Sequence, residues 1–284
     1  MRQVGYPTLD YSSIAETRDA LHSYSRILGG WLKSLRLRRK HWWHASLRPS
    51  ITGMSTGVVR ANVPFELELN LLESRLVIRS GHLELSEPLV GQSAGDLASC
   101  LDGLLADLGV RSTDTQGAAS PSETEYPGYS NDMAIRMHGA LASIAGALED
   151  LQAGIREETS PVQIWPHHFD LSMIWLPGPK IEGEDPADEE HADKQMNFGF
   201  VFGDETISEP YLYVTGYPLP ESLPAADMPQ PAVWQTDGFD GVVLRYADLV
   251  AQQDPYEYLQ GLWTGLMHVA RPDLCDADEK RKPE

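Results

Sequence analysis

The spacing of apolar residues along the chain predicts four helices, over residues 13–39, 93–109, 131–157 and 256–269. Their apolar positions recur at steps of three and four residues, which is the period of one helical face. In the first helix, Ser12 or Ser13 could serve as N-cap, with Glu16 completing a capping box after Ser13. Gly29-Gly30 in its middle is costly for a helix, so we expect a kink or a close contact there. Gly109 is expected to end the second helix in the C′ position.

A second period, of two residues, predicts strands. Residues 65–71 (FELELNL) alternate strictly and should form a half-buried antiparallel strand that returns through 76–79 and 82–85 as a hairpin or a three-stranded meander. Its glutamates are interpreted as a solvated face. Further strands are expected at 41–48, 162–175, 198–203, 211–218, 232–234 and 241–244. The fold class is therefore α+β, a mainly antiparallel sheet flanked by about four helices.

The order of these elements repeats along the chain. Residues 1–110 give helix, Trp/His strand, hairpin and helix; residues 131–273 give helix, Trp/His strand, sheet and helix. Residues 111–130 are rich in Ser, Thr, Gly and Pro and are interpreted as a linker loop, whereas 274–284 are interpreted as a disordered tail. We expect the second half to pack as one unit, and the repeated order could reflect an internal pseudo-twofold axis.

Charge narrows the choice of partners. The net charge of −20 argues against nucleic-acid binding, and no run of about 18 apolar residues predicts a membrane span. Two distant cysteines and the absence of an apolar leader favour a soluble cytoplasmic protein. Residues 1–50, however, carry nine Lys or Arg against three acids. This segment could dock on the acidic remainder, or it could form a local anion site around Lys33–Lys40. The acid-rich stretch 177–195 is expected to be a mobile loop.

The densest meeting of apolar structure and chemistry lies at residues 160–175 (SPVQIWPHHFDLSMIW). His168 and Asp170 are two residues apart, so in a strand they would face the same way and could reach one divalent ion, such as zinc or iron. The candidate metal ligands are His41, His44, His167, His168 and Asp170. Without a metal, Asp170 could orient His168 as a general base, with Glu209 and Tyr211 lining the cleft.

Two non-catalytic interpretations remain open. Asp170 and the histidines could simply satisfy hydrogen bonds in a buried aromatic cluster. Alternatively, the protein could bind a small molecule without chemistry, in a pocket lined by Trp42, Trp43, Trp165, Trp175, Tyr211 and Tyr213. Convergence of the polar groups on one point would favour an enzyme or a metal site.

Four segments in order carry a resemblance: HWWH at 41–44, FELELNLLESRLVIRS at 65–80, SPVQIWPHHFDL at 160–171 and EPYLYVTGYP at 209–218. Together they resemble a family of bacterial proteins known only as a domain of unknown function, over roughly residues 20–273. The resemblance implies a single globular unit and draws attention to His41, His44 and Asp170. It implies no particular reaction.

Overall fold

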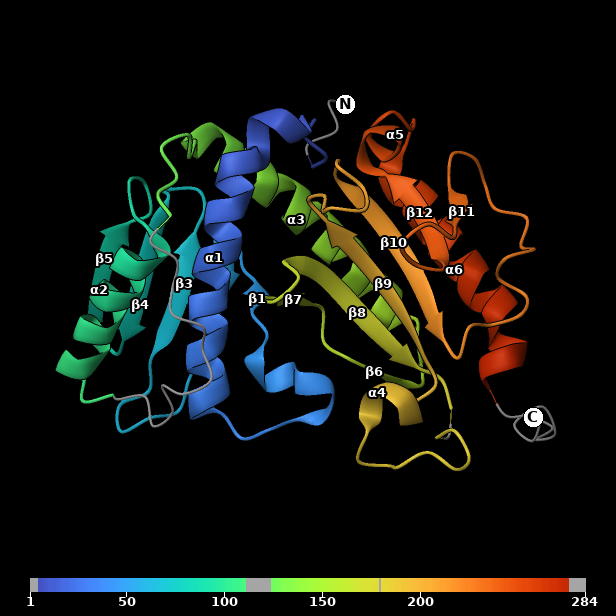
Figure 1. The fold of residues 1–284 in the computed structure, drawn as a ribbon, viewed down its shortest axis with the longest axis horizontal. Coiled ribbons are helices and arrows are strands. Elements are labelled where there is room, and N and C mark those ends of the chain that lie inside the picture. Colours follow the sequence, from blue (N-terminus) through green and yellow to red (C-terminus); the bar gives the residue numbers. More distant parts are fainter. Residues whose placement is uncertain (1–4, 111–123, 179, 276–284) are drawn as a thin grey trace. The chain divides into compact units, whose positions relative to one another are not determined.

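The computed structural model describes residues 5–110, 124–178 and 180–275 (Figure 1). They contain two antiparallel sheets and several helices, which confirms the α+β class. The chain divides into two compact units, the first made of residues 1–142 with 163–170 and the second of residues 143–162 with 171–284. None of the described helices is both long and apolar enough to cross a membrane. The pseudo-twofold repeat stays a prediction.

The first unit is built on a five-stranded sheet in the order β1-β2-β3-β4-β5. Its strands are β1 (Arg48–Pro49), β2 (Gly53–Ser55), β3 (Glu66–Asn70), β4 (Arg75–Ser80) and β5 (Leu83–Pro88). The other elements are α1 (Tyr11–Leu35), the 3-10 helix η1 (Lys40–Ala45), α2 (Ala94–Asp107), the first part of α3 (Asn131–Ala153) and β7 (Gln163–Trp165). The three-stranded meander predicted over 65–85 is thus confirmed as β3, β4 and β5.

Helices α1 and α2 contact each other, and α1 also contacts β3 (Figure 1). The apolar stripe of α1 is buried as its period predicts, with Ile14, Leu21 and Leu28 fully covered. The cap of α1 differs from the prediction, because the Asp10 side chain, not Ser12 or Ser13, accepts the backbone N–H of Ser13. The helix ends at Leu35, four residues earlier than predicted.

Helix α2 begins and ends as its sequence indicates. Ser93 and Asp96 form a reciprocal capping box, and Gly109 follows the helix with a positive φ of 72°. Loop residues 111–123 lie outside the described residues, as does the end of the tail beyond Cys275. The linker and tail predictions therefore stay predictions.

The second unit holds a sheet in the order β11-β12-β10-β9-β8-β6 (Figure 1). These strands are β6 (Glu158–Thr159), β8 (Asp170–Leu176), β9 (Gln195–Val201), β10 (Tyr211–Tyr217), β11 (Val233–Gln235) and β12 (Gly241–Arg245). Helices α4 (Glu189–Ala192), α5 (Tyr246–Val250) and α6 (Pro255–Leu274) complete it with the rest of α3. The core includes an edge-to-face pair between Phe198 of β9 and Trp263 of α6.

The acid-rich stretch 177–195 is not all loop, because it contains the short helix α4, and Ile181 donates its N–H to the carbonyl of Ala192. The mobility of this stretch stays a prediction. The glutamates of the meander do not all face solvent, because Glu68 is only 3% exposed. Alternation placed Glu68 correctly on the face opposite Leu67 and Leu69, but alternation cannot say what covers that face.

Candidate functional site

The HWWH segment is a tight turn and not the predicted strand. His41 and Trp42 have φ values of 46° and 59°, which no strand residue adopts, and the segment forms η1. The backbone N–H of Arg39 donates to Nδ1 of His44 at 3.3 Å and helps to close the turn. Left-handed backbone at two successive residues with large side chains is unusual and tends to mark functional sites.

Cations surround the aromatic rings of this turn. Lys33 Nζ lies 5.1 Å and the Arg38 guanidinium carbon 4.9 Å from the centre of the Trp42 ring, and Arg39 lies 6.0 Å from the ring of Trp43. Such cation–π contacts are favourable and orient the indole. The Trp42 ring also stacks on His44, with centroids 5.5 Å apart. We call Lys33, Arg36, Arg38 and Arg39 the cationic cluster.

His44 is buried beneath this cluster, with 3% exposure. Burial lowers the pKa of His44, and the positive charges of Arg38, Lys33, Arg36 and Arg39 lower it further. The imidazole is therefore neutral at pH 7. Because Nδ1 accepts the Arg39 N–H, the ring proton is on Nε2. The turn thus combines cationic side chains with a neutral N–H donor.

The second His-rich segment lies beside the first within the same unit. Leu47 and Ile164 exchange two backbone hydrogen bonds, of 3.0 and 2.9 Å. Ser46 donates to Oε1 of Gln163 at 2.7 Å, and Arg48 donates to the same oxygen at 3.1 Å. The two segments that sequence analysis singled out are therefore joined, although they are more than a hundred residues apart in the chain.

One face of α1 supports both segments. His22, Arg26, Gly29 and Lys33 follow each other at steps of four, three and four residues, so they share a face. Nε2 of His22 lies 3.2 Å from the carbonyl oxygen of His167, and its ring stacks on Phe169 at 5.4 Å. Phe169 itself has a φ of 58°. Sequence reasoning missed His22 and Arg26, although their helical spacing from Gly29 and Lys33 could have found them.

The predicted metal ligands are placed as follows. His41 and His44 are buried in η1, Asp170 is buried at 7% exposure, and His167 and His168 are exposed. The rings of His167 and His168 lie 4.2 Å apart. Although much of the His167 side chain is exposed, partial desolvation of its ring lowers the pKa to about 4, and the nearby His168, His22 and Arg26 act in the same direction. Within residues 5–110, 124–178 and 180–275, no three His, Cys, Asp or Glu side chains are arranged to hold a metal ion.

The predicted catalytic residues are shared between the two units. His168 and Asp170 belong to the first unit, and Glu209 and Tyr211 belong to the second. In the second unit, the Tyr211 hydroxyl donates to Oδ2 of Asp204 at 2.5 Å, and Glu209 forms an ion pair with Arg245. Tyr211 is 4% exposed, and its hydroxyl holds the loop after β9 through the bond to Asp204. The acid–base pairing of His168 with Asp170 stays a prediction.

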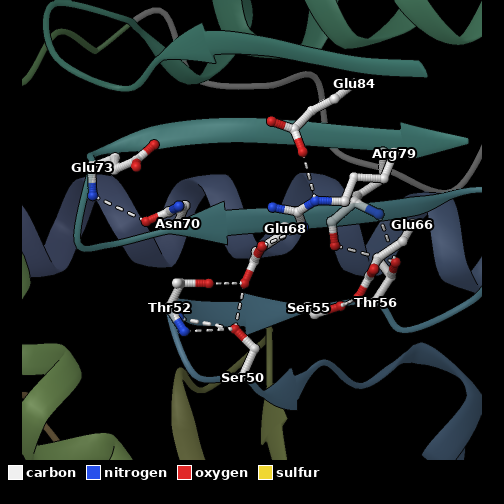
Figure 2. Close-up of polar contacts among 12 residues, drawn as sticks. Ser50, Thr52, Ser55, Thr56, Glu66, Glu68, Asn70, Glu73, Arg79 and Glu84 are labelled. Atoms are coloured by element: carbon white, nitrogen blue, oxygen red, sulfur yellow. Dashed lines mark hydrogen bonds and ion pairs between the residues drawn. The ribbon is translucent and has the colours of Figure 1, made fainter. Parts of the chain in front are cut away.

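A buried carboxylate lies elsewhere in the first unit, where sequence analysis expected a solvated surface. Figure 2 shows Glu68 of β3 between Arg79 of β4 and the loop before β2. Oε1 of Glu68 accepts the Ser50 hydroxyl at 2.5 Å and also the Thr52 hydroxyl, and Oε2 accepts from Arg79 at 2.6 Å. Burial alone would raise the pKa of Glu68, but these three donors stabilise the charged carboxylate and together hold its pKa below the ordinary value.

One known protein family matches nearly the whole of this α+β chain. The chain belongs to the family described as "Family of unknown function (DUF5996)", whose model matches residues 6–269. This membership confirms the resemblance to a family of unknown function. No curated protein and no solved structure matches the chain.

Substitutions at Gly29 and Gly30 can test how closely the second histidine segment packs against α1. A methyl group on Gly29 would lie 2.7 Å from Cγ of Pro166, whereas one on Gly30 would meet nothing within 4 Å. Gly30→Ala should therefore stabilise the protein by about 0.5–1 kcal/mol through helix propensity. Gly29→Ala should forfeit that gain and destabilise by about 1–2 kcal/mol, because Pro166 must move. Urea denaturation measures both, and equal effects at the two positions would contradict this packing.

Proposed function

We propose that the first unit binds a small, multiply charged anion at the cationic cluster, in contact with Trp42 and His44. The observation that carries this proposal is the placement of two cations within about 5 Å of one indole ring that stacks on a buried histidine. Residues 33–48 contain six Lys or Arg and no Asp or Glu, so this segment is strongly basic.

Like charges close together repel, so the cluster is electrostatically costly. Coulomb repulsion between two unit charges 4 Å apart is about 1 kcal/mol in water and about 4 kcal/mol near a protein surface. The lowered pKa of His44 is one expression of this local positive field. An anion bound among the cations would remove the cost, and arginine guanidinium groups suit the oxygens of phosphate or carboxylate.

The neutral His44 adds specificity to the proposed site. Its Nε2–H can donate a hydrogen bond to an anionic oxygen without requiring a proton from solvent. The strained backbone at His41 and Trp42 supports the proposal, because strain of this kind is retained where geometry has a use. A binding protein, not an enzyme, is the simplest function these features support.

Calorimetry with inorganic phosphate and pyrophosphate tests the proposal at about 0.1 M salt, where the Debye length is roughly 10 Å and the distant acidic residues are screened. Wild type should bind pyrophosphate more tightly than phosphate. Lys33→Glu and Arg39→Glu should each weaken binding at least about tenfold, since each replaces an attraction by a repulsion. Arg136→Glu, at an exposed site on α3, is the matched control and should bind like wild type.

The binding measurements distinguish a local anion site from a general effect of net charge. Loss of binding in the two cluster variants but not in Arg136→Glu would support an anion site at this turn. Equal weakening in all three variants would indicate only the effect of net charge and would contradict the proposal. Absence of pyrophosphate binding by wild type would also overturn it.

A further inference from the structure

An open hollow of about 630 Å³ lies in the second unit. The described residues that line it are Gly154, Arg156, Glu157 and Arg271. Gly154 directly follows α3, and Arg271 lies in the last turn of α6. Pockets that hold small molecules have volumes of roughly 300–1,000 Å³, so the hollow is large enough for such a ligand. Three of these four residues are charged, so a ligand must match their charges.

Arg271 and Glu157 form an ion pair at the hollow. Nη1 of Arg271 donates to Oε1 of Glu157, and Nη2 donates to Oε2 at 3.4 Å. The guanidinium carbon of Arg271 also lies 4.9 Å from the centre of the ring of Trp175, which is buried. A cation–π contact of this kind orients the arginine. The buried ring therefore fixes the arginine, and the arginine fixes the carboxylate.

Glu157 can accept a further hydrogen bond from a ligand. The hydrogen bonds from Arg271 lower the pKa of Glu157, so its carboxylate is charged at pH 7. A carboxylate has about four acceptor positions, and the bond that Oε2 accepts from Arg271 is long at 3.4 Å. Gly154 adjoins the C-terminal end of α3, where the helix dipole places partial negative charge. Both features favour a cationic donor group at this side of the hollow.

Arg156 presents the opposite charge to the same hollow. Its side chain is exposed, so its guanidinium is accessible to a ligand. A guanidinium group can donate two parallel hydrogen bonds to one carboxylate. Arg156 and Glu157 are consecutive in the chain, so one short segment offers both a cation and an anion to the hollow.

We propose that this hollow binds a free amino acid, whose carboxylate contacts Arg156 and whose ammonium group contacts Glu157. The site is separate from the anion site proposed for the first unit, and it takes a different class of ligand. A simple carboxylate would be repelled by Glu157 and would give it no donor. A simple amine would be repelled by Arg156 and Arg271. An amino acid carries both charges and matches both sides of the hollow.

Ligand-detected NMR with L-alanine, propionate and ethylammonium tests the proposal on the full chain. Propionate lacks the ammonium group of alanine, and ethylammonium lacks its carboxylate. L-alanine should bind at least about tenfold more tightly than either partial analogue. Arg156→Gln and Glu157→Gln should each weaken alanine binding at least about tenfold, because each removes one charged contact. Arg136→Gln, at an exposed position on α3 outside the hollow, is the matched control and should bind like wild type.

Thermal melting of each variant without ligand separates lost binding from lost folding. Glu157→Gln also breaks the ion pair with Arg271, whereas Arg156→Gln leaves that pair in place. Weaker alanine binding by Arg156→Gln at an unchanged melting temperature would therefore support the site. Propionate binding as tight as that of alanine, equal weakening in Arg136→Gln, or no alanine binding by wild type would overturn the proposal. Lys33→Glu should leave alanine binding unchanged, and a loss there would place the amino acid in the first unit and refute this second site.

Discussion

Replacing Glu68 by alanine should lower the free energy of unfolding by about 2–3 kcal/mol. The carboxylate is almost fully buried and accepts hydrogen bonds from Ser50, Thr52 and Arg79 (Figure 2). Its removal would leave two hydroxyl groups and one charged donor without that acceptor. The loop before β2 would then lose its side-chain hydrogen bonds to β3 and keep only its backbone contacts. Urea denaturation followed by circular dichroism measures the change.

Glu84→Ala is the matched control, because Glu84 binds the same arginine at 2.9 Å but is 61% exposed. Exposed ion pairs contribute little, so this variant should lose less than about 1 kcal/mol.

The pKa of Glu68 is lower in the folded protein than in the unfolded chain. Its contribution to stability is therefore complete above about pH 4.3, the ordinary value for glutamate, and is lost as pH falls through the folded pKa. The difference in stability between wild type and Glu68→Ala should therefore shrink in acid, and a difference that does not shrink would contradict the assigned charge state.

The meander that carries Glu68 shows what a sequence can and cannot predict. Strict alternation over residues 65–71, followed by the apolar segments 76–79 and 82–85, is enough to predict β3, β4 and β5 and the face on which each residue of β3 lies, but not the pairing of β3 with β2. The donors that bury the carboxylate come from Ser50 and Thr52, in a loop with no periodic signal, and from Arg79 across the strand pair. Those contacts depend on tertiary structure, so burial of a charged residue could not be inferred from local pattern.

The candidate site shows the same limit at the HWWH turn. Adjacent aromatic residues favour a strand by propensity, and that local preference is overruled by the Arg39–His44 hydrogen bond and by the cations packed on the Trp42 ring. The uneven distribution of charge along the sequence is enough to suggest an anion site around Lys33–Lys40. The charge distribution alone cannot predict that His44 is neutral or that His22 contacts the second histidine segment. Both depend on how α1 packs against residues 41–44 and 166–169.

The two histidine segments were both singled out by composition, and the structure brings them together through Leu47 and Ile164. No periodic pattern in the sequence predicts this proximity. The contact is a single antiparallel bridge between Leu47 and Ile164. Gly29 of α1 permits close packing of the second segment because it leaves room for Pro166. A glycine pair that is costly for a helix is therefore explained at its first residue by close packing, while Gly30 meets nothing within 4 Å.

Gly53→Ala should be the most damaging of these substitutions, lowering stability by about 3 kcal/mol or more. A methyl group on Gly53 would lie 1.9 Å from the carbonyl oxygen of Leu69, which is backbone of the paired strand and cannot rotate away. β2 would have to separate from β3, and the loop bearing Ser50 and Thr52 would move away from Glu68.

Gly103→Ala in α2, where nothing lies within 4 Å, is the control and should stabilise by about 0.5–1 kcal/mol. Because both Gly53→Ala and Glu68→Ala disrupt the hydrogen bonds from Ser50 and Thr52 to Glu68, the double variant should lose less than the sum of the two single losses. A loss below about 1 kcal/mol for Gly53→Ala, or strict additivity in the double variant, would show that the loop is not held in this way.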